Sequence, residues 1–106
     1  MLKINYEFRK GIFFIRLIGD LNKRNYYKNE KYLYDLINYN GFKNVVLNTN
    51  MLRNIDIYGI NYIACFCDIL RENNSRLTLC DKSNVWKSIF GNNIDNISSE
   101  LEAFDA

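Results

Sequence analysis

The chain contains no histidine, which excludes histidine-based acid–base catalysis and most transition-metal sites. Its five glycines are never spaced as G-x-G-x-x-G, or as the G-x-x-x-x-G-K-[ST] loop that cradles phosphates. No serine occurs before Ser75, so the G-x-S-x-G nucleophile elbow is missing too. We therefore expect neither an enzyme, nor a metal site, nor a bound cofactor.

Cysteine is scarce, and the three that occur are Cys65, Cys67 and Cys80. No C-x-x-C redox pair is present, and three cysteines without histidine cannot supply the roughly four ligands of a structural zinc site. We expect all three to be buried, reduced thiols that pack as small hydrophobic side chains.

Long hydrophobic runs are also absent. None approaches the ~20 residues of a membrane-spanning helix, and Met1–Tyr6 lacks the apolar segment of a signal peptide. We expect a cytoplasmic protein without membrane contact. With 106 residues, 48% hydrophobic and 25% charged, the chain has the composition of one globular domain covering residues 1–106.

The spacing of apolar residues predicts a chain in which strands alternate with helices. Residues 2–8 alternate between apolar and polar, as in a half-buried strand, and Arg9-Lys10-Gly11 predicts a tight turn into the next strand. Val45-Val46-Leu47 is a continuous apolar run, typical of a strand covered on both faces. We expect strands at 2–8, 12–18, 44–48, 77–80 and 94–97, and helices at 25–40, from 60 to the Asn73-Asn74 pair, at 83–90 and from 99 onwards.

The resulting order is β-β-α-β-α-β-α-β-α, which implies an α/β fold with a mixed, mostly parallel sheet opened by one antiparallel hairpin. The segment Thr49–Asn54 is polar and predicts a loop. Ser83 predicts the N-cap of the short third helix. Ser99, with Glu102 three residues further on, has the capping-box pattern of a terminal helix.

Two patterns leave other functions open. Asp20 and Asp56 each lie near a loop that follows a strand, and paired carboxylates can perform acid–base chemistry. No partner nucleophile or cation site accompanies them, so we expect capping or turn roles instead. Residues 1–54 carry ten basic against four acidic side chains, and Lys23 to Lys31 is interleaved with tyrosines, as in some RNA or DNA binders. The strand order and the missing aromatic RNP signature do not fit an RNA-recognition motif.

Three segments together resemble the STAS domain of bacterial anti-sigma factor antagonists. Leu17-Ile18-Gly19-Asp20-Leu21-Asn22 resembles the family's strand end followed by G-[DE]-L-[DN], and Gly41 to Asn48 resembles its central strand. Asn54-Ile55-Asp56-Ile57-Tyr58-Gly59-Ile60 aligns with the family's [FI]-[IM]-D-S-S-G-[LI]. The predicted order of elements is also the order of that family.

The resemblance implies a regulatory phosphorylation site that this chain lacks. In the family, D-S-S-G begins the second helix and its first serine is phosphorylated, which releases the antagonist from an anti-sigma factor of the ATP-binding serine kinase type. Ile57 and Tyr58 occupy the two serine positions here, while Asp56 and Gly59 remain. Isoleucine has no oxygen to phosphorylate, and the tyrosine hydroxyl lies much farther from the backbone, so we expect no phosphoserine in this loop.

The resemblance therefore predicts a protein that works by binding a protein partner, namely an anti-sigma factor or a related ATP-binding serine kinase, in a partner-switching pathway that regulates transcription. We expect a monomer or weak dimer that does not bind nucleic acid. An alternative is a STAS-like sensor or scaffold module that binds a small molecule such as a nucleotide or lipid. The expected docking surface lies at one end of the sheet and consists of Asp20, Asn22, Arg53, Asp56, Ile57, Tyr58 and Gly59.

Overall fold

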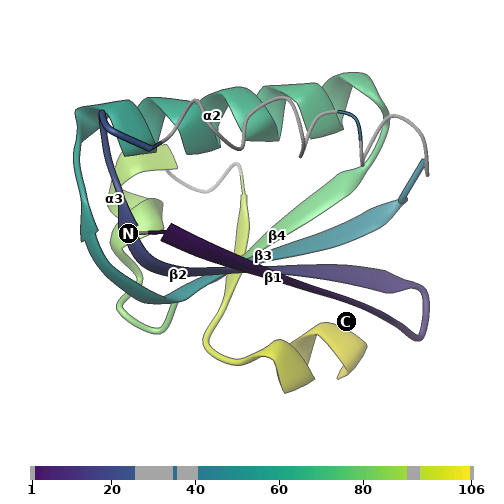
Figure 1. Cartoon of the computed structure of the whole chain (residues 1–106). Coiled ribbons are helices and arrows are strands. Elements are labelled where there is room, and N and C mark those ends of the chain that lie inside the picture. Colours follow the sequence, from purple (N-terminus) through teal and green to yellow (C-terminus); the bar gives the residue numbers. More distant parts are fainter. Residues whose placement is uncertain (1, 26–34, 36–40, 91–93, 106) are drawn as a thin grey trace.

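A mixed β-sheet forms the centre of the computed structural model, which describes residues 2–25, 35, 41–90 and 94–105 (Figure 1). In the described part of the chain the strands are β1 (Leu2–Arg9), β2 (Ile12–Leu21), β3 (Asn44–Ile55), β4 (Arg76–Cys80) and β5 (Asp95–Ile97). The helices are α2 (Ile57–Glu72), α3 (Val85–Phe90) and the 3₁₀ helix η2 (Glu100–Asp105). The predicted helix at 25–40 falls almost wholly outside the described residues.

The strands follow one another across the sheet in the order β1-β2-β3-β4-β5. β1 and β2 are antiparallel, and the later pairs are parallel. The β1–β2 connection is the predicted turn, with φ of 51° at Lys10 and 80° at Gly11, and two positive φ angles suit the right-handed twist of a hairpin. The predicted fold class is confirmed.

The main hydrophobic core lies between the sheet and the two helices α2 and α3, on the face drawn uppermost in Figure 1. Val45 and Leu47 point into this core, whereas Val46 belongs to a smaller cluster on the opposite face, so the strand is covered on both sides as predicted. α2 contributes a wide apolar arc to this core, and its buried side chains include Tyr62, Ile63, Phe66, Ile69 and Leu70. No helix of the described part of the chain is long and apolar enough to cross a membrane.

A partly buried ionic cluster holds η2 against the opposite face of the sheet. The Arg16 guanidinium donates two hydrogen bonds to the Glu100 carboxylate, at 2.8 and 2.7 Å, and one to Glu7 at 2.9 Å. The Asn48 side-chain amide donates to the same Glu100 carboxylate at 2.6 Å. These donors, Arg16 foremost, lower the pKa of Glu100, so the charged form is the one that fastens η2 to β2 and β3.

The expected loop at 49–54 is wrong, since β3 continues as a strand to Ile55. β2 also runs further than expected, and after two irregularities in the register it pairs Asp20 with Asn54 and Leu21 with Ile55. β4 stops pairing with β3 at Asn48, so the last part of β3 has a neighbour on one side only. Polar residues are tolerated there because much of that segment is exposed, and its composition therefore resembled a loop.

Three smaller expectations are also corrected. The carboxylate of Asp81, rather than Ser83, accepts the N–H of Val85 at the start of α3, at 3.0 Å. Glu102 accepts from the N–H and hydroxyl of Ser98, one residue before the predicted Ser99, and the terminal helix is of the 3₁₀ type. Cys65 is exposed.

Cys67 and Cys80 are buried free thiols, as predicted. Burial in apolar surroundings raises the pKa of Cys67 to about 12 and that of Cys80 to about 11. Both thiols are therefore protonated at neutral pH and pack as hydrophobic side chains.

Candidate docking surface

The seven residues singled out in the sequence come together where β2 and β3 end and α2 begins. Asp20 is near the end of β2, Arg53 is near the end of β3, and Asp56 directly precedes α2. The pairing of Asp20 with Asn54 and of Leu21 with Ile55 places these ends side by side. Residues 20–22 and residues 53–59, at least 31 positions apart in the chain, thus lie at the same end of the sheet.

Asp56 joins two segments through its carboxylate. As the N-cap of α2 it has extended backbone angles, and one carboxylate oxygen accepts the N–H of Gly59 at 3.0 Å. The other oxygen accepts the N–H of Lys23, in the loop after β2, at 3.0 Å. The N–H of Asp56 itself donates to the carbonyl of Leu21 at 3.3 Å. Residues 21–23 and the first turn of α2 are therefore fixed to each other at this residue.

The electrostatics of Asp56 follow from these bonds. The N–H of Gly59 is the largest cause of a lowered pKa, and the N–H of Lys23 acts in the same direction. Asp56 is thus ionised at neutral pH, and its negative charge lies at the positive end of the helix dipole. Both of its oxygens are occupied within the chain, which makes it a structural anchor for the surface.

Asp20 is held in a second, more exposed group. It accepts a hydrogen bond from the side-chain amide of Asn54 at 3.1 Å, which is the largest cause of its lowered pKa, and its carboxylate lies 3.6 Å from the guanidinium of Arg53. The Arg53 side chain is 73% exposed, so solvent screens this ion pair. Arg53 is therefore available to a partner, whereas Asp20 and Asp56 have the hydrogen bonds of turn and cap residues.

Asn22 shapes the loop after β2. Its side-chain oxygen accepts the N–H of Arg24 at 2.9 Å, and its own N–H donates to the side-chain oxygen of Asn25 at 3.0 Å. The side-chain amide of Asn25 in turn donates to the carbonyl of Asp20 at 2.8 Å. This network presents the N–H of Lys23 to Asp56.

The two residues after Asp56 supply exposed apolar surface. Ile57 is 61% exposed and Tyr58 is 40% exposed, although both begin a helix whose other apolar residues are mostly buried. The ammonium group of Lys23 lies 5.4 Å from the centre of the Tyr58 ring, a cation–π contact. Sequence reasoning missed this contact because it considered Lys23 only as one of the basic residues between Lys23 and Lys31.

Gly59 differs from the other six residues because it is buried. A Cβ atom at this position would lie 2.6 Å from the carbonyl oxygen of Leu21 and 2.7 Å from a side-chain carbon of Ile55. Glycine therefore allows the first turn of α2 to pack directly on the end of β2. Gly59 therefore contributes to the surface by allowing the helix and the sheet to approach closely.

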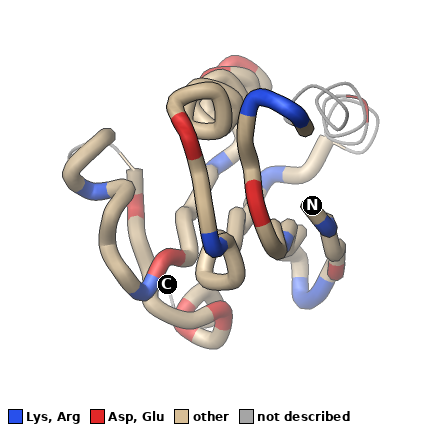
Figure 2. The backbone as a smooth tube through the Cα atoms, turned by 60° about the vertical axis from the view of Figure 1, so that its left-hand side comes forward, with Lys and Arg blue, Asp and Glu red and all other residues tan. Residues whose placement is uncertain are grey.

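The charges around the surface are mixed in sign. Figure 2 shows acidic and basic positions interspersed along the described backbone, with no continuous basic stripe. Lys28 and Lys31, which the nucleic-acid alternative requires, lie outside the described residues. The described part of the chain thus gives this alternative no additional support.

The comparisons with known proteins agree on one fold. The family model for the STAS domain matches residues 3–101. No curated protein sequence matches the chain.

Solved structures of anti-sigma factor antagonists are among those similar to this chain. SpoIIAA in its unphosphorylated form superposes with a TM-score of 0.79 at 18% identity, covering 99% of this chain and 96% of that one. An anti-sigma factor antagonist from Mycobacterium paratuberculosis gives 0.78 at 9% identity, covering 99% and 92%. A third structure, the Bacillus cell-fate determinant SpoIIAA in its phosphorylated form, gives 0.73 at 19% identity, with 97% of both chains covered. At these identities the likeness establishes the fold.

Replacing Gly59 by alanine tests the close approach of α2 to β2. Helix propensity alone favours alanine over glycine by about 1 kcal/mol. The clash with the Leu21 carbonyl reverses this sign, and we expect Gly59→Ala to destabilise the protein by about 1–3 kcal/mol in urea unfolding. Asn61→Ala, at an exposed position of the same helix, is the control and should be neutral or stabilising. An unchanged or raised midpoint for Gly59→Ala would contradict the packing described here.

Proposed function

Since this chain belongs to the STAS domain family, we propose that it is an anti-sigma factor antagonist-like protein that binds a protein partner in a partner-switching pathway. The partner is an anti-sigma factor or a related ATP-binding serine kinase, and the protein acts in the cytoplasm by binding, without catalysis. The contact is made by the surface at the ends of β2 and β3 and the start of α2.

One observation carries the proposal: Asp56 fixes the first turn of α2 while Ile57 and Tyr58 remain exposed. An apolar side chain that is rigidly held and solvated in the free protein gains free energy when a partner covers it. Complete burial of an isoleucine contributes about 1.5–3 kcal/mol. Because the supporting loop is already ordered by Asp56 and Asn22, little conformational entropy is lost there on binding.

Charged side chains at the rim of the surface would orient the partner. Arg53 is largely exposed and only loosely paired with Asp20, so its guanidinium can turn to a carboxylate of the partner. Lys23 carries a second positive charge beside Tyr58. A partner surface that is apolar at its centre and acidic at its edge would complement these residues.

Loss of the serine pair changes the regulation of this surface. A phosphate would add about −1.5 to −2 charges to the first turn of α2, at the centre of the proposed contact. Ile57 cannot accept a phosphate, so this chain is fixed in the unmodified, binding-competent state.

We expect the double substitution Ile57→Asp, Tyr58→Asp to abolish partner capture. Wild-type protein should recover an ATP-binding anti-sigma factor from a lysate of the native cell, identified by mass spectrometry. With the purified partner, calorimetry should show affinity reduced by about a hundredfold or more, since apolar burial is lost and two charges would be buried.

The matched control is Ile89→Asp, Leu101→Asp, which adds the same charge at two other exposed apolar positions, on α3 and η2. This variant should bind as the wild type does. Equal capture by wild type and by the Ile57, Tyr58 variant would show that the docking surface is placed wrongly.

A second prediction concerns phosphorylation. Incubated with ATP and the partner kinase, wild-type protein should gain no phosphate within residues 54–60, by intact mass and peptide mapping. The substitution Ile57→Ser, Tyr58→Ser recreates D-S-S-G behind the same Asp56 cap, and this variant should become phosphorylated on the first serine. Phosphate on wild-type Tyr58, or a serine variant that stays unmodified with an active kinase, would overturn the assignment.

A further inference from the structure

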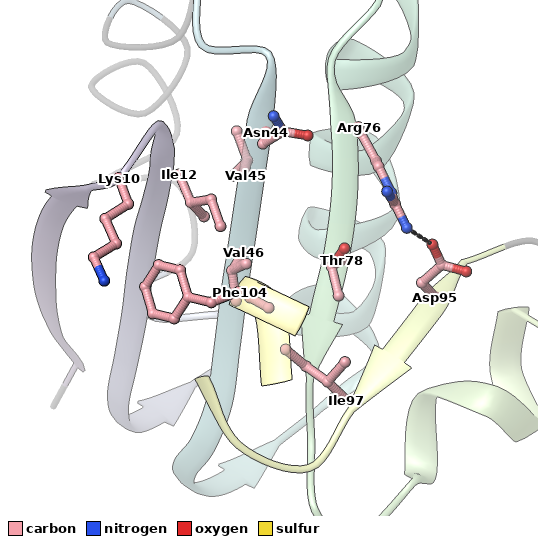
Figure 3. A pocket seen from close by; sticks show the side chains of 11 residues that line it. Lys10, Ile12, Asn44, Val45, Val46, Arg76, Thr78, Asp95, Ile97 and Phe104 are labelled. Atoms are coloured by element: carbon pink, nitrogen blue, oxygen red, sulfur yellow. Dashed lines mark hydrogen bonds and ion pairs between the residues drawn. The ribbon is translucent and has the colours of Figure 1, made fainter. Parts of the chain in front are cut away.

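A groove of about 590 Å³ lies on the face of the sheet opposite α2, beside η2 (Figure 3). It is lined by the beginnings of β2, β3 and β4, by β5 and by η2. The proposed docking surface lies instead where β2 and β3 end. The groove is therefore separate from that surface, and its volume falls within the roughly 300–1,000 Å³ of small-molecule sites.

The floor of the groove is apolar because η2 is too short to cover this face. Its six residues place Phe104 against Phe14, with ring centres 5.7 Å apart. Ile12, Ile97 and Phe104 remain only partly buried, around the buried Val46. In Figure 3 these side chains form a continuous apolar strip between the two sides of the groove. The main core, on the other face, is covered by the sixteen-residue helix α2 together with α3.

Cationic groups stand at both sides of this strip. Lys10, in the β1–β2 turn, lies 5.5 Å from the centre of the Phe104 ring and has no carboxylate partner among the described residues. Arg9 lies at the same distance from that ring. On the other side, Arg76 pairs with Asp95 at 2.8 Å, and both side chains are more than half exposed. The charged residues lining the groove thus carry two positive charges and one negative charge.

We propose that this groove binds a single-chain anionic amphiphile, with its carboxylate at Lys10 and its hydrocarbon chain along Phe104, Val46 and Ile97. The apolar strip matches an acyl chain. The ammonium group of Lys10 at its end, which has no carboxylate partner in the described part of the chain, matches an anionic head. Arg76 adds positive potential from the opposite side, although Asp95 compensates part of it. The site is independent of partner docking, and its failure would leave the proposed function untouched.

The probe is sodium dodecanoate, kept below its micelle concentration and titrated into ¹⁵N-labelled protein. We expect saturable changes in amide chemical shift at Ile12, Val46, Ile97 and Phe104, with little change at residues 53–60. Dodecyltrimethylammonium, which has a hydrocarbon chain of nearly the same length and the opposite charge, should bind at least about tenfold more weakly. This comparison uses wild-type protein alone, so it does not depend on any variant folding.

Lys10→Asp should weaken dodecanoate binding by about tenfold or more. It creates an Asp-Gly pair at the two positive φ angles of the turn, a sequence that this turn type favours, so the hairpin is retained. Lys87→Asp makes the same change of charge on α3 and should leave binding unaltered.

Several results would overturn the proposal. One is the absence of saturable binding, or changes that lie outside the groove. Another is equal affinity for the cationic probe. Stronger binding of ATP at the same residues would identify a nucleotide site instead. Shifts at these residues that depend on protein concentration alone would identify contact with a second copy of the chain.

Discussion

The carboxylate of Asp56 accepts one N–H from the first turn of α2 and another from the loop after β2, and the geometry of the surface depends on these two bonds. They reinforce the bond from the Asp56 N–H to the Leu21 carbonyl and the pairing of Leu21 with Ile55, which join the same two segments. The N-cap bond satisfies a backbone donor that the helix itself cannot pair. The N–H of Lys23, 33 residues earlier in the chain, donates to the same carboxylate.

Gly59 works with Asp56 in this arrangement. Its missing side chain lets α2 begin directly on the Leu21 carbonyl, so the helix leaves the sheet at once and Ile57 and Tyr58 are turned outward. The Asp and Gly of the family's motif thus perform structural work that does not depend on the serines between them. This separation explains how the chain can keep the fold of anti-sigma factor antagonists while isoleucine and tyrosine replace the phosphorylatable pair.

The spacing of apolar residues was sufficient to predict the elements that bury one face, such as the β1–β2 hairpin and α2. It failed where burial is incomplete: the last part of β3 is polar because it has a single neighbouring strand, and so it resembled a loop. The resemblance to the family's motifs was sufficient to predict which residues form the candidate site. The bond from Lys23 could not be foreseen, because it uses a backbone N–H that any residue would provide. The groove was equally hidden, since it arises from the shortness of η2 rather than from any motif.

The protein therefore presents two different surfaces: an exposed apolar turn at the start of α2, where β2 and β3 end, and an apolar groove beside η2, on the face of the sheet opposite α2. The role of the first is tested most directly by hydrogen–deuterium exchange of the protein alone and in complex with the proposed partner, an anti-sigma factor. Binding through the anchored turn predicts slower exchange on complex formation in residues 20–25 and 53–60, with the groove residues of β4 and η2 unchanged. Protection confined to β4, β5 and η2 would contradict it, because the partner would then bind the opposite face.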